Sequence, residues 1–529
     1  MNQERLFSGA VCLGIELGST RIKAVLTDPE GRWIETGIYD WENQLVDGIW
    51  TYRPEEIRQG VQGAYRSLNE KLKATYGQGL TKIAAMGISA MMHGYLAFDQ
   101  EGQWLSPFQT WRNTNTTEAA QALTDLFQWN VPLRWSIAHL YQRILDQEPH
   151  VKELHFLTTL SGYVHYLLTG QKILGIGDAS GMFPIDSVRG SYDLEKLAQF
   201  DQLIAPYGYS WKLEDLLPQV AKAGEEAGRL TPEGARFLDP TGALQAGSLF
   251  GPPEGDAGTG MTATHALLPN TGNCSAGTST FAMVVLDHPL QGIHSEIDLV
   301  TTPEGRPVAM AHANNGTSDL NAWVKLFEEV LVLFGQEVDA NERFERLFLH
   351  SLKGAADGGD MSAIGYYSGE AIPNLPEGRP LFVRRPESPL TLANFMRAHI
   401  YGALAVVKIG FDILKQEGVV ELREMVGHGG LFKTAGVAQR YLSAAIDAPV
   451  VVMETANEGG AWGMALLACY RLGKKEGEGL TAFLDRCVFD RVKKTALRAS
   501  SEEVAAFERY MADYQQVLFV EREAVKRMR

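Results

Sequence analysis

The stretch "CLGIELGSTRIKAVLTDPEGR", residues 12–32, places one acid between an apolar run and a turn of small residues. An apolar run ends on Glu16, turns through Gly18-Ser19-Thr20 and continues as a second apolar run. Apolar runs bounded by turn residues predict two strands joined by a tight turn. Two interpretations are open: an ordinary hairpin, or a pocket in which the acid meets a metal ion and the turn meets phosphate.

The length and composition of the chain predict two large domains. The chain has 529 residues, and single domains rarely stay undivided beyond about 300 residues. A hydrophobic content of 45% with 21% charged residues is typical of a globular protein. The net charge of -16 argues against nucleic acid and anionic membranes as main partners.

Cysteine usage and the N-terminus predict a cytoplasmic protein. The four cysteines form no CxxC pair, so neither a zinc site nor a disulfide framework is supported. Reduced thiols in the cytosol are therefore expected. No apolar stretch approaches the ~20 residues of a membrane span. The first residues, "MNQERLFSGA", lack the basic start and apolar core of a signal peptide.

Hydrophobic periodicity predicts the main elements. Apolar runs between turn residues predict four early strands, at 12–17, 22–27, 33–39 and 83–88. Residues 54–76 predict a helix, because apolar residues recur at helical spacing after a proline and two acids. Residues 118–240 predict mainly helices, 391–418 a long helix, and the residues from 480 onward a polar helical tail.

A second block, "NTGNCSAGTSTFAMVVLD" at residues 270–287, repeats the opening design. Its turn, Gly277-Thr278-Ser279, corresponds to Gly18-Ser19-Thr20 in the first block. Two strand–turn–strand units about 260 residues apart predict two related halves. Each half would carry one phosphate-facing turn, with a ligand between them.

The small residues in these turns suit the binding of anions. They let backbone N–H groups approach a phosphate, and their hydroxyls can donate hydrogen bonds to it. Glu16 would hold Mg²⁺ directly or through water, because hard cations prefer oxygen ligands. At Gly427-His428-Gly429-Gly430, bare backbone would let a flat ligand such as adenine pack closely. The alternative for each glycine-rich turn is tight geometry alone.

An acid between glycines is the candidate catalytic group. Asp256 lies in "GPPEGDAGTG", where turn glycines can expose its carboxylate in a cleft. A carboxylate so placed can act as a general base that takes a proton from a substrate hydroxyl. The alternative is an Asx-turn or a helix N-cap, both of which favour Asp.

Two further segments are candidates for binding a sugar. Met92-His93-Gly94 follows a predicted strand, and His93 would either bond a polyol or play a structural part. Trp111, Arg112 and Asn113 are consecutive. Tryptophan offers an apolar face to a sugar ring, and the other two side chains can bond hydroxyls.

Taken in order, these segments resemble the FGGY family of carbohydrate kinases, within the actin-like ATPase superfamily, over about residues 11–475. The first phosphate motif resembles "GIELGSTRIKAVLTD", the sugar segment "GISAMMHGYLAFDQEG" and the second phosphate motif "SAGTST". The aspartate of "GDAGTG" resembles the catalytic aspartate of the family, and "GHGGLFKT" resembles its adenosine motif. Two further family motifs resemble "YYSGEAIPN" and "NEGGAWGMALLA".

The resemblance implies an α/β fold of two ribonuclease-H-like domains, of the actin and hexokinase type, with the active site in the cleft between them. Residues 10–268 would form the N-terminal domain, which carries the sugar site, the first phosphate motif and the catalytic aspartate. Residues 269–475 would form the ATP-binding C-terminal domain. Residues 476–529 would form a helical tail.

The resemblance also implies the roles of single residues. Asp256 would be the general base. ATP with Mg²⁺ would be bound, its phosphates among Gly18, Ser19, Thr20, Lys23, Gly277, Thr278 and Ser279, and its adenine beside Gly429 and Gly430. The metal ion would lie at Glu16 and Asp256. The sugar pocket would be lined by Met92, His93, Trp111, Arg112, Asn113 and Asp256.

Two positions depart from the pattern of the family. The first strand usually ends on Asp, and here it ends on Glu16. The sugar segment usually has the form Trp-x-Asp-x-Arg, whereas here the acid is replaced by Asn113 and the arginine by Asn115. A sugar-hydroxyl acceptor is thereby altered, which places the usual substrates in question.

The expected substrate is a ketopentose whose terminal hydroxyl attacks the γ-phosphate of ATP. The Met-His-Gly segment resembles xylulokinases, and the length and polar tail, "FERYMADYQQ", resemble ribulokinases. D-xylulose therefore ranks ahead of L-ribulose, followed by a deoxy-ketose or an alditol. The partners would be the sugar and ATP, with no nucleic acid and no membrane, and a homodimer is the assembly considered.

Two other classes remain as alternatives. A non-catalytic sugar- or nucleotide-binding regulator on the same fold is motivated by Glu16 and Asn113. Asp256 opposes it, since a pure binding protein needs no general base. A chaperone ATPase of the same superfamily would need a peptide-binding domain, for which the tail after residue 475 is too short.

Overall fold

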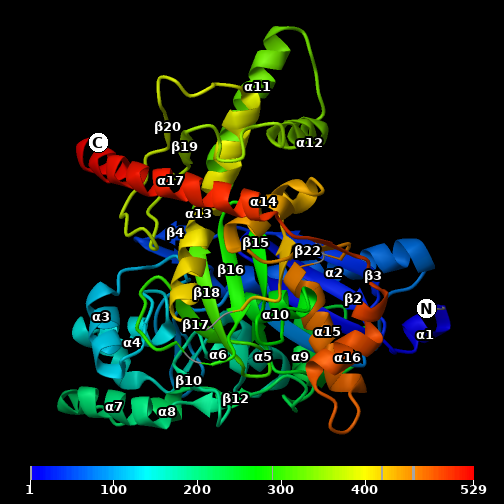
Figure 1. Ribbon diagram of the computed structural model, residues 1–529. Coiled ribbons are helices and arrows are strands. Elements are labelled where there is room, and N and C mark those ends of the chain that lie inside the picture. The colour runs from blue at the N-terminus through cyan, green and yellow to red at the C-terminus, as the bar shows by residue number, and fades with distance from the viewer. Residues whose placement is uncertain (1–2, 289, 419–420, 456–458, 529) are drawn as a thin grey trace. The chain divides into compact units, whose positions relative to one another are not determined.

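The computed structural model describes the chain apart from residues 1–2, 289, 419–420, 456–458 and 529 (Figure 1). The chain forms two compact units, each built from separate segments. Unit 1 comprises Met1–Leu267, Leu299–Val308 and Glu458–Val492. Unit 2 comprises Leu268–Asp298, Ala309–Asn457 and Lys493–Arg529. Each unit carries a mixed sheet with helices, so the predicted α/β class with two domains is confirmed.

The sheet of unit 1 has the two strands of residues 12–32 near its centre. β1 (Cys12–Leu17) pairs antiparallel with β2 (Arg21–Thr27) and parallel with β6 (Ala85–Ala90). β3 (Trp33–Asp40) extends the sheet beyond β2, and β13 (Leu249–Phe250) and β14 (Glu254–Gly255) pair parallel with β6. The four predicted early strands are confirmed, the last with a shift of two residues.

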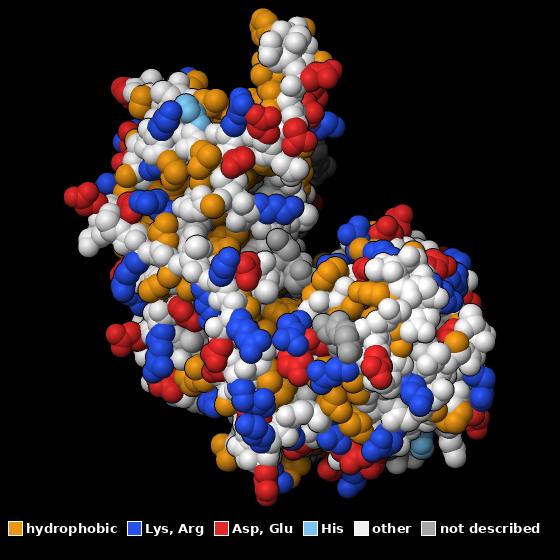
Figure 2. Space-filling model, turned by 90° about the vertical axis from the view of Figure 1, so that its right-hand side faces the viewer, with side chains coloured by type: hydrophobic (Ala, Val, Ile, Leu, Met, Phe, Trp, Pro, Cys, Tyr) orange, Lys and Arg blue, Asp and Glu red, His pale blue; other side chains and the backbone are white. Residues whose placement is uncertain are grey.

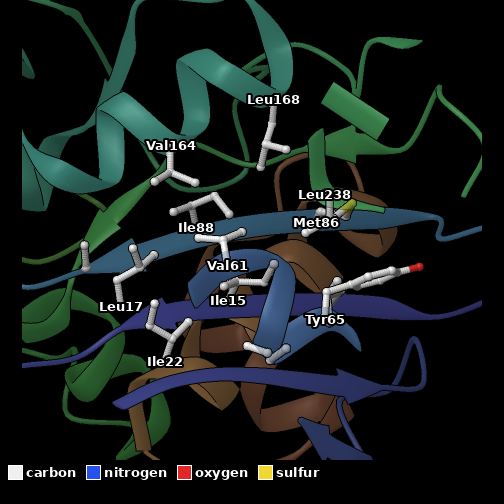
Figure 3. Packing of buried hydrophobic residues seen from close by; sticks show 14 of the residues in the cluster. Ile15, Leu17, Ile22, Val61, Tyr65, Met86, Ile88, Val164, Leu168 and Leu238 are labelled. Atoms are coloured by element: carbon white, nitrogen blue, oxygen red, sulfur yellow. The ribbon is translucent and has the colours of Figure 1, made fainter. Parts of the chain in front are cut away.

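One face of this sheet builds the core of unit 1. Successive side chains of a strand point to opposite faces, and in β1 this sets Ile15 and Leu17 in the buried cluster. α2 (Pro54–Tyr76) and α5 (Leu160–Thr169) supply residues to the same cluster. Val61 and Val164 are examples in Figure 3. The helix predicted at 54–76 is confirmed, and Gly77 ends it in the left-handed conformation.

α15 (Gly459–Gly473) packs on β1 where β1 has a glycine and the helix has alanines. A Cβ on Gly14 would lie 2.2 Å from the carbonyl oxygen of Ala461 and 2.4 Å from the amide nitrogen of Ala465. The helix therefore belongs to unit 1, which corrects its expected place within residues 269–475. The physical reason is a contact between backbones that only a glycine in β1 allows.

Gly14→Ala should lower the free energy of unfolding by about 3 kcal/mol, because a methyl group at this position meets backbone that cannot rotate away. Urea unfolding followed by circular dichroism measures the change. Gly251→Ala is the matched control, since its Cβ would meet its nearest neighbour only at 3.9 Å. Equal unfolding midpoints for the two variants would contradict the proposed packing.

The remaining elements of unit 1 surround this core. The helices are α1 (Gln3–Phe7), α3 (Thr117–Phe127), α4 (Ser136–Leu145), α6 (Ile176–Ala179), α7 (Leu194–Ile204), α8 (Leu213–Leu216), α9 (Pro232–Leu238), α10 (Asp256–Ala263) and α16 (Leu480–Cys487). The short strands are β4 (Gln44–Val46), β5 (Ile49–Thr51), β7 (Leu96–Phe98), β8 (Phe156–Thr158), β9 (Ile173–Gly175), β10 (Ile185–Asp186), β11 (Ser191–Tyr192) and β12 (Gln219–Ala221). The region 118–240 is thus mainly helical, as predicted, with short strands between the helices.

The sheet of unit 2 repeats the arrangement of the first. β15 (Thr271–Ala276) lies between the antiparallel β16 (Thr280–Val285) and the parallel β21 (Glu424–His428), as β1 lies between β2 and β6. The complete order is β17-β18-β16-β15-β21-β22-β23. The other strands are β17 (Asp298–Thr301), β18 (Pro307–Ala313), β22 (Val450–Met453) and β23 (Lys494–Leu497), with β19 (Met361–Ile364) and β20 (Leu381–Arg384) in a separate pair. The predicted internal repeat is present.

Helices pack around a long central helix in unit 2. α13 (Leu392–Gln416) is buried over most of its length and confirms the helix predicted at 391–418. α12 (Ala340–Ser351), α14 (Val437–Ile446) and α17 (Ser501–Arg527) contact it, as does α11 (Ser318–Leu333). In Figure 1, α17 crosses beside α13 and α14.

The tail differs from its prediction. Residues 476–529 were expected to be helical, yet β23 pairs antiparallel with β22 at the end of the second sheet. Three of its four residues are exposed, so the strand lacks the apolar alternation that would predict it. The tail is also divided, since α16 belongs to unit 1 and α17 to unit 2.

The helices and the surface have ordinary polarity. Among the described residues, no helix combines the length and the hydropathy that crossing a membrane requires. On the face shown in Figure 2, acidic and basic side chains are interspersed.

Candidate active site

In unit 1, the predicted acids lie at the carboxyl ends of three parallel strands. Glu16 of β1 is opposite Ser89 of β6, and Ser89 is opposite Glu254 of β14. Parallel neighbours end at the same edge of a sheet, which is where ligands bind in open α/β sheets. Glu16, the Met92-His93 segment after β6 and Asp256 after β14 therefore share one edge.

Glu16 is held between a strand and a helix terminus. Its Oε2 accepts a hydrogen bond of 3.1 Å from the backbone N–H of Ala461, near the start of α15. A Cβ on Gly460 would lie 2.2 Å from Oε1, so a side chain at this position would displace the carboxylate of Glu16. Burial raises the pKa of Glu16, the positive charge of Lys23 opposes this, and the charge of Asp256 adds to it.

Lys23 faces Glu16 across the first hairpin. The two are paired in the register of β1 and β2, so an ammonium group and a carboxylate lie at the same sheet edge. A Cβ on Gly459 would lie 3.7 Å from Nζ of Lys23. The predicted motif "NEGGAWGMALLA" begins with Asn457 and Glu458, which lie outside the described residues.

Asp256 is the first residue of α10, and Gly255 is the N-cap. The alternative of an aspartate N-cap is therefore wrong. Oδ1 of Asp256 accepts the N–H of Ala257 at 3.0 Å, and the side chain is open to solvent between buried neighbours. Desolvation by the protein around it raises the pKa of Asp256 to about 6, while hydrogen bonds from the N–H groups of Met92 and Ala257 oppose the shift.

Two buried carboxyls lie behind Asp256, and sequence reasoning missed both. Glu254 accepts the N–H groups of Gly177 at 3.2 Å and of Asp178 at 3.1 Å, while Asp178 accepts hydroxyl hydrogen bonds from Thr159, at 2.7 Å, and Ser161. Burial raises the pKa of Glu254 to about 8 and that of Asp178 to about 7. Glu254 is therefore mainly protonated at neutral pH. No sequence signal marks such burial.

The predicted sugar segment lies against Asp256. A Cβ on Gly255 would be 2.2 Å from Cγ of Met92, so the methionine packs on the backbone just before the acid. His93 is buried, adopts a φ of 70° and bonds the carbonyl of Gly181 through Nδ1 at 3.1 Å. The structure thus places Met92 beside the backbone that precedes Asp256 and His93 beside Gly181, and a shared sugar pocket stays a prediction.

The consecutive residues Trp111, Arg112 and Asn113 have different environments. The amide of Asn113 accepts the N–H of Trp50 at 2.9 Å and donates to the carbonyls of Trp50, at 2.8 Å, and Thr110, at 3.0 Å. Both amide hydrogens are therefore used by backbone. The guanidinium of Arg112 lies 3.6 Å from the ring centroid of Trp50, while Trp111 is partly buried against the core. Asn113 positions the segment, and Arg112 is the exposed polar group.

Two aromatic residues that sequence reasoning missed hold the first predicted phosphate turn. Nε1 of Trp41 donates to the carbonyl of Gly18 at 2.7 Å, and the hydroxyl of Tyr52 donates to that of Ser19 at 2.6 Å. The two rings stack with centroids 4.0 Å apart. Among the described residues, no acceptor is found for the N–H groups of Ser19 and Thr20, which suits a turn that binds an anion.

In unit 2, the second predicted phosphate turn and the predicted adenosine motif are neighbours. Ser275 of β15 is opposite His428 of β21, so both strands end at one edge. Gly429 has a φ of 93°, and a Cβ there would lie 2.6 Å from the carbonyl oxygen of Ala276. A Cβ on Gly430 would meet no atom within 4 Å, which leaves bare backbone beside the turn.

The acids at this sheet edge in unit 1 are candidate ligands of Mg²⁺. The described part of the chain holds no group of three or more His, Cys, Asp or Glu side chains placed to bind a metal ion. Mg²⁺ in phosphoryl-transfer sites is usually bound by one or two carboxylates plus water and phosphate oxygens. Glu16 and Asp256 fit this donor set.

Models of two protein domains match the chain. Residues 11–241 match the N-terminal domain of the FGGY family of carbohydrate kinases, and residues 272–472 match its C-terminal domain. The chain belongs to the FGGY family of carbohydrate kinases. It is therefore a carbohydrate kinase, of a family that uses ATP, and the predicted family and enzyme class are confirmed.

The relatives of this FGGY kinase have several substrates. It is 20% identical to a xylulose kinase of Haemophilus influenzae over 88% of the chain and 92% of the relative. It is 24% identical to a sedoheptulokinase of Mus musculus over 89% of the chain and 99% of the relative. A ligand-bound xylulose kinase from Lactobacillus acidophilus has a TM-score of 0.79 at 17% identity, over 98% and 99% of the chains. A glycerol kinase from Plasmodium falciparum with ADP has a TM-score of 0.74 at 13% identity, over 97% of this chain and 98% of that kinase. The structural matches support the fold.

Proposed function

We propose that this FGGY kinase transfers the γ-phosphoryl group of ATP to the terminal hydroxyl of a ketopentose, D-xylulose before L-ribulose, with Asp256 as general base. The observation that carries the proposal is the position of Asp256. It is open to solvent at the start of α10 and borders the sugar segment at Met92. The likeness to xylulose kinases supports the choice of sugar.

The chemistry of Asp256 suits proton transfer at neutral pH. With a pKa of about 6 it is mainly ionised at pH 7, yet it is a stronger base than an ordinary aspartate. It would take the proton of the attacking hydroxyl on a carboxylate oxygen. Met92, His93, Trp111 and Arg112 would orient the sugar, and Asn113 would hold the segment in place.

The residues of both units would hold ATP and Mg²⁺. Phosphoryl transfer relies on positioning and on neutralising charge, and bound Mg²⁺ supplies part of that neutralisation. Lys23 adds a positive charge beside Glu16. The phosphate-binding residues would be Gly18, Ser19, Thr20, Lys23, Gly277, Thr278 and Ser279, with Gly429 and Gly430 beside the adenine. The metal-binding residues would be Glu16 and Asp256. A cytoplasmic location and a homodimer stay predictions.

A sugar panel tests the proposal. ADP formation should appear with one or two ketopentoses, at a kcat/KM at least about tenfold above that for the other sugars, which is the discrimination that ~1.4 kcal/mol of transition-state binding provides. The panel contains D-xylulose, L-ribulose, a deoxy-ketose, two alditols and, because of the mouse relative, sedoheptulose. Coupled measurement of ADP reports turnover, and a reaction without sugar is the control.

Three results would contradict the proposal. Intact ATP binding without turnover on any sugar would favour the non-catalytic regulator. ATP hydrolysis that no sugar accelerates would favour a chaperone-type ATPase. Turnover confined to an alditol or a deoxy-ketose would keep the kinase but replace the substrate.

A further inference from the structure

A buried acid in unit 2 lies outside the candidate site. Glu370 is 0% exposed and belongs to the segment "YYSGEAIPN", to which the proposed function assigns no part. Its backbone forms a two-residue bridge with Leu375, with N–H to O distances of 2.8 and 2.9 Å. A buried carboxylate is costly unless hydrogen bonds compensate for lost water. The partners of Glu370 therefore indicate what it does.

Three hydrogen bonds of the Glu370 side chain reach one loop, which runs from β18 to α11. Its two carboxylate oxygens accept the backbone N–H of Asn314, the backbone N–H of Asn315 and the side-chain Nδ2 of Asn315, each at 3.0 Å. Burial raises the pKa of Glu370, and these donors oppose the shift. One carboxylate with two acceptor oxygens thus satisfies three donors at the end of a strand.

The same loop is bound back to the segment of Glu370. Oδ1 of Asn315 accepts the N–H groups of Tyr367 at 2.9 Å and of Ser368 at 3.1 Å. Nδ2 of Asn314 donates to the carbonyl of Gly369 at 2.9 Å. The loop is therefore fixed by bonds in both directions, with Glu370 at the centre.

The next two residues of the loop hold the second phosphate turn. The N–H of Gly316 donates to the carbonyl of Thr278 at 2.7 Å. The N–H and the hydroxyl of Thr317 both donate to the carbonyl of Gly277, each at 2.9 Å. A Cβ on Gly316 would lie 2.4 Å from that same oxygen, so the two backbones touch.

These bonds set the direction of the N–H groups in the turn. In a trans peptide the C=O and the N–H point opposite ways, and the described chain has no cis peptide bond. The carbonyls of Gly277 and Thr278 point at the loop. The N–H groups of Thr278 and Ser279 in the same two peptides therefore point away from it.

We propose that Glu370 is a positioning residue for the nucleotide phosphates. Through Asn315 and the Gly316-Thr317 backbone, it fixes the peptides whose N–H groups, at Thr278 and Ser279, face the phosphates. This inference rests on the proposed binding of ATP by that turn. Donors fixed before the ligand arrives need no reorganisation on binding, so loosening the loop weakens binding of phosphates and leaves the adenosine part unaffected.

Glu370→Gln tests the inference in the full chain. Glutamine keeps the size of the side chain but replaces one acceptor oxygen with an NH₂ group that faces N–H donors. Calorimetric titration should give Kd values for ATP and ADP raised at least about tenfold, which corresponds to ~1.4 kcal/mol. The Kd for adenosine and the KM for the sugar should stay within about twofold. Glu377→Gln, which changes an exposed acid three residues beyond this segment, is the matched control and should change neither the nucleotide Kd values nor the KM for the sugar.

A second variant guards against failure of the first to fold. Thr317→Val removes the hydroxyl bond to Gly277 and leaves Glu370 unchanged. It should also weaken the binding of ATP and ADP more than the binding of adenosine. Unchanged ATP affinity in both variants, or equal weakening of ATP and adenosine, would overturn the inference. If Glu370→Gln does not fold, Thr317→Val alone decides. Failure of the proposed function is a separate result, because a wild type that binds ATP but phosphorylates no sugar still permits every binding measurement.

Discussion

Asp256→Asn should lower kcat for sugar phosphorylation about 10³-fold, within the range that general bases contribute. The amide has nearly the shape of the carboxylate and can still accept the N–H of Ala257, but it cannot take up the proton of the hydroxyl. Single-turnover measurement of ADP with the best sugar reports the chemical step. The Kd for ATP should change little more than twofold, because the proposed role of Asp256 lies mainly with the hydroxyl.

The control for this variant is an acid at the surface. Asp513→Asn removes a carboxylate of α17 that pairs with Arg385 where both are exposed, and exposed pairs contribute little. It should leave kcat unchanged. An Asp256→Asn enzyme whose kcat stays within tenfold of wild type would contradict the assignment of the base.

The pH dependence of the wild type gives an independent test of the same residue. A general base acts in its ionised form, so the proposed role requires the carboxylate of Asp256, whose pKa desolvation raises to about 6. The value of kcat/KM should therefore fall as the pH decreases through about 6, with the slope of a single protonation. The residual activity of Asp256→Asn should lack this limb. A wild-type profile that stays flat down to pH 5 would show that another group is the base.

Glu16→Gln should lower Mg²⁺-dependent turnover about 100-fold, the upper part of the range for groups that orient a metal site. Glutamine retains an oxygen that can accept the N–H of Ala461, so the variant removes the charge while keeping the connection to α15. The dependence of kcat on Mg²⁺ concentration measures the effect, and higher Mg²⁺ should restore part of the activity. Wild-type turnover at every Mg²⁺ concentration would remove the metal role.

Glu16→Asp is the matched variant, since it has the acid that is usual in the family. It keeps the charge but is one methylene shorter, so turnover should stay within about tenfold of wild type. The structure shows what the extra length of Glu16 reaches: the backbone N–H of Ala461, beside Gly460, where a side chain would collide with the carboxylate. If Glu16→Asp is as impaired as Glu16→Gln, the contact with α15 matters as much as the charge.

Local features of this FGGY kinase follow from the sequence. The strands at 12–17 and 22–27 and the helix at 54–76 have clear periodicity and turn or capping residues, and the structure contains them within one residue. The two glycine-containing turns are recognisable because their signals lie within a few residues. Asp256 stands out for the same reason, as an acid between glycines.

Contacts over long sequence distances could not be predicted in this way. The positioning of Asn113 depends on Trp50, and the carbonyls of the first turn depend on Trp41 and Tyr52. The burial of Glu254 and Asp178 behind Asp256 has no counterpart in the spacing of residues. Each of these environments is created by elements that meet only when the sheet and its helices assemble.

The family, the repeated strand–turn–strand design and the candidate acid Asp256 therefore follow from the sequence, because each rests on residues close together in the chain. The tertiary structure alone decided that α15 packs on β1, over 440 residues away. It also decided which groups shift the pKa of Asp256 and which bonds join Glu370 to the phosphate turn. Backbone contact, desolvation and hydrogen-bond direction are properties of assembled neighbours, and no local pattern of residues carries them.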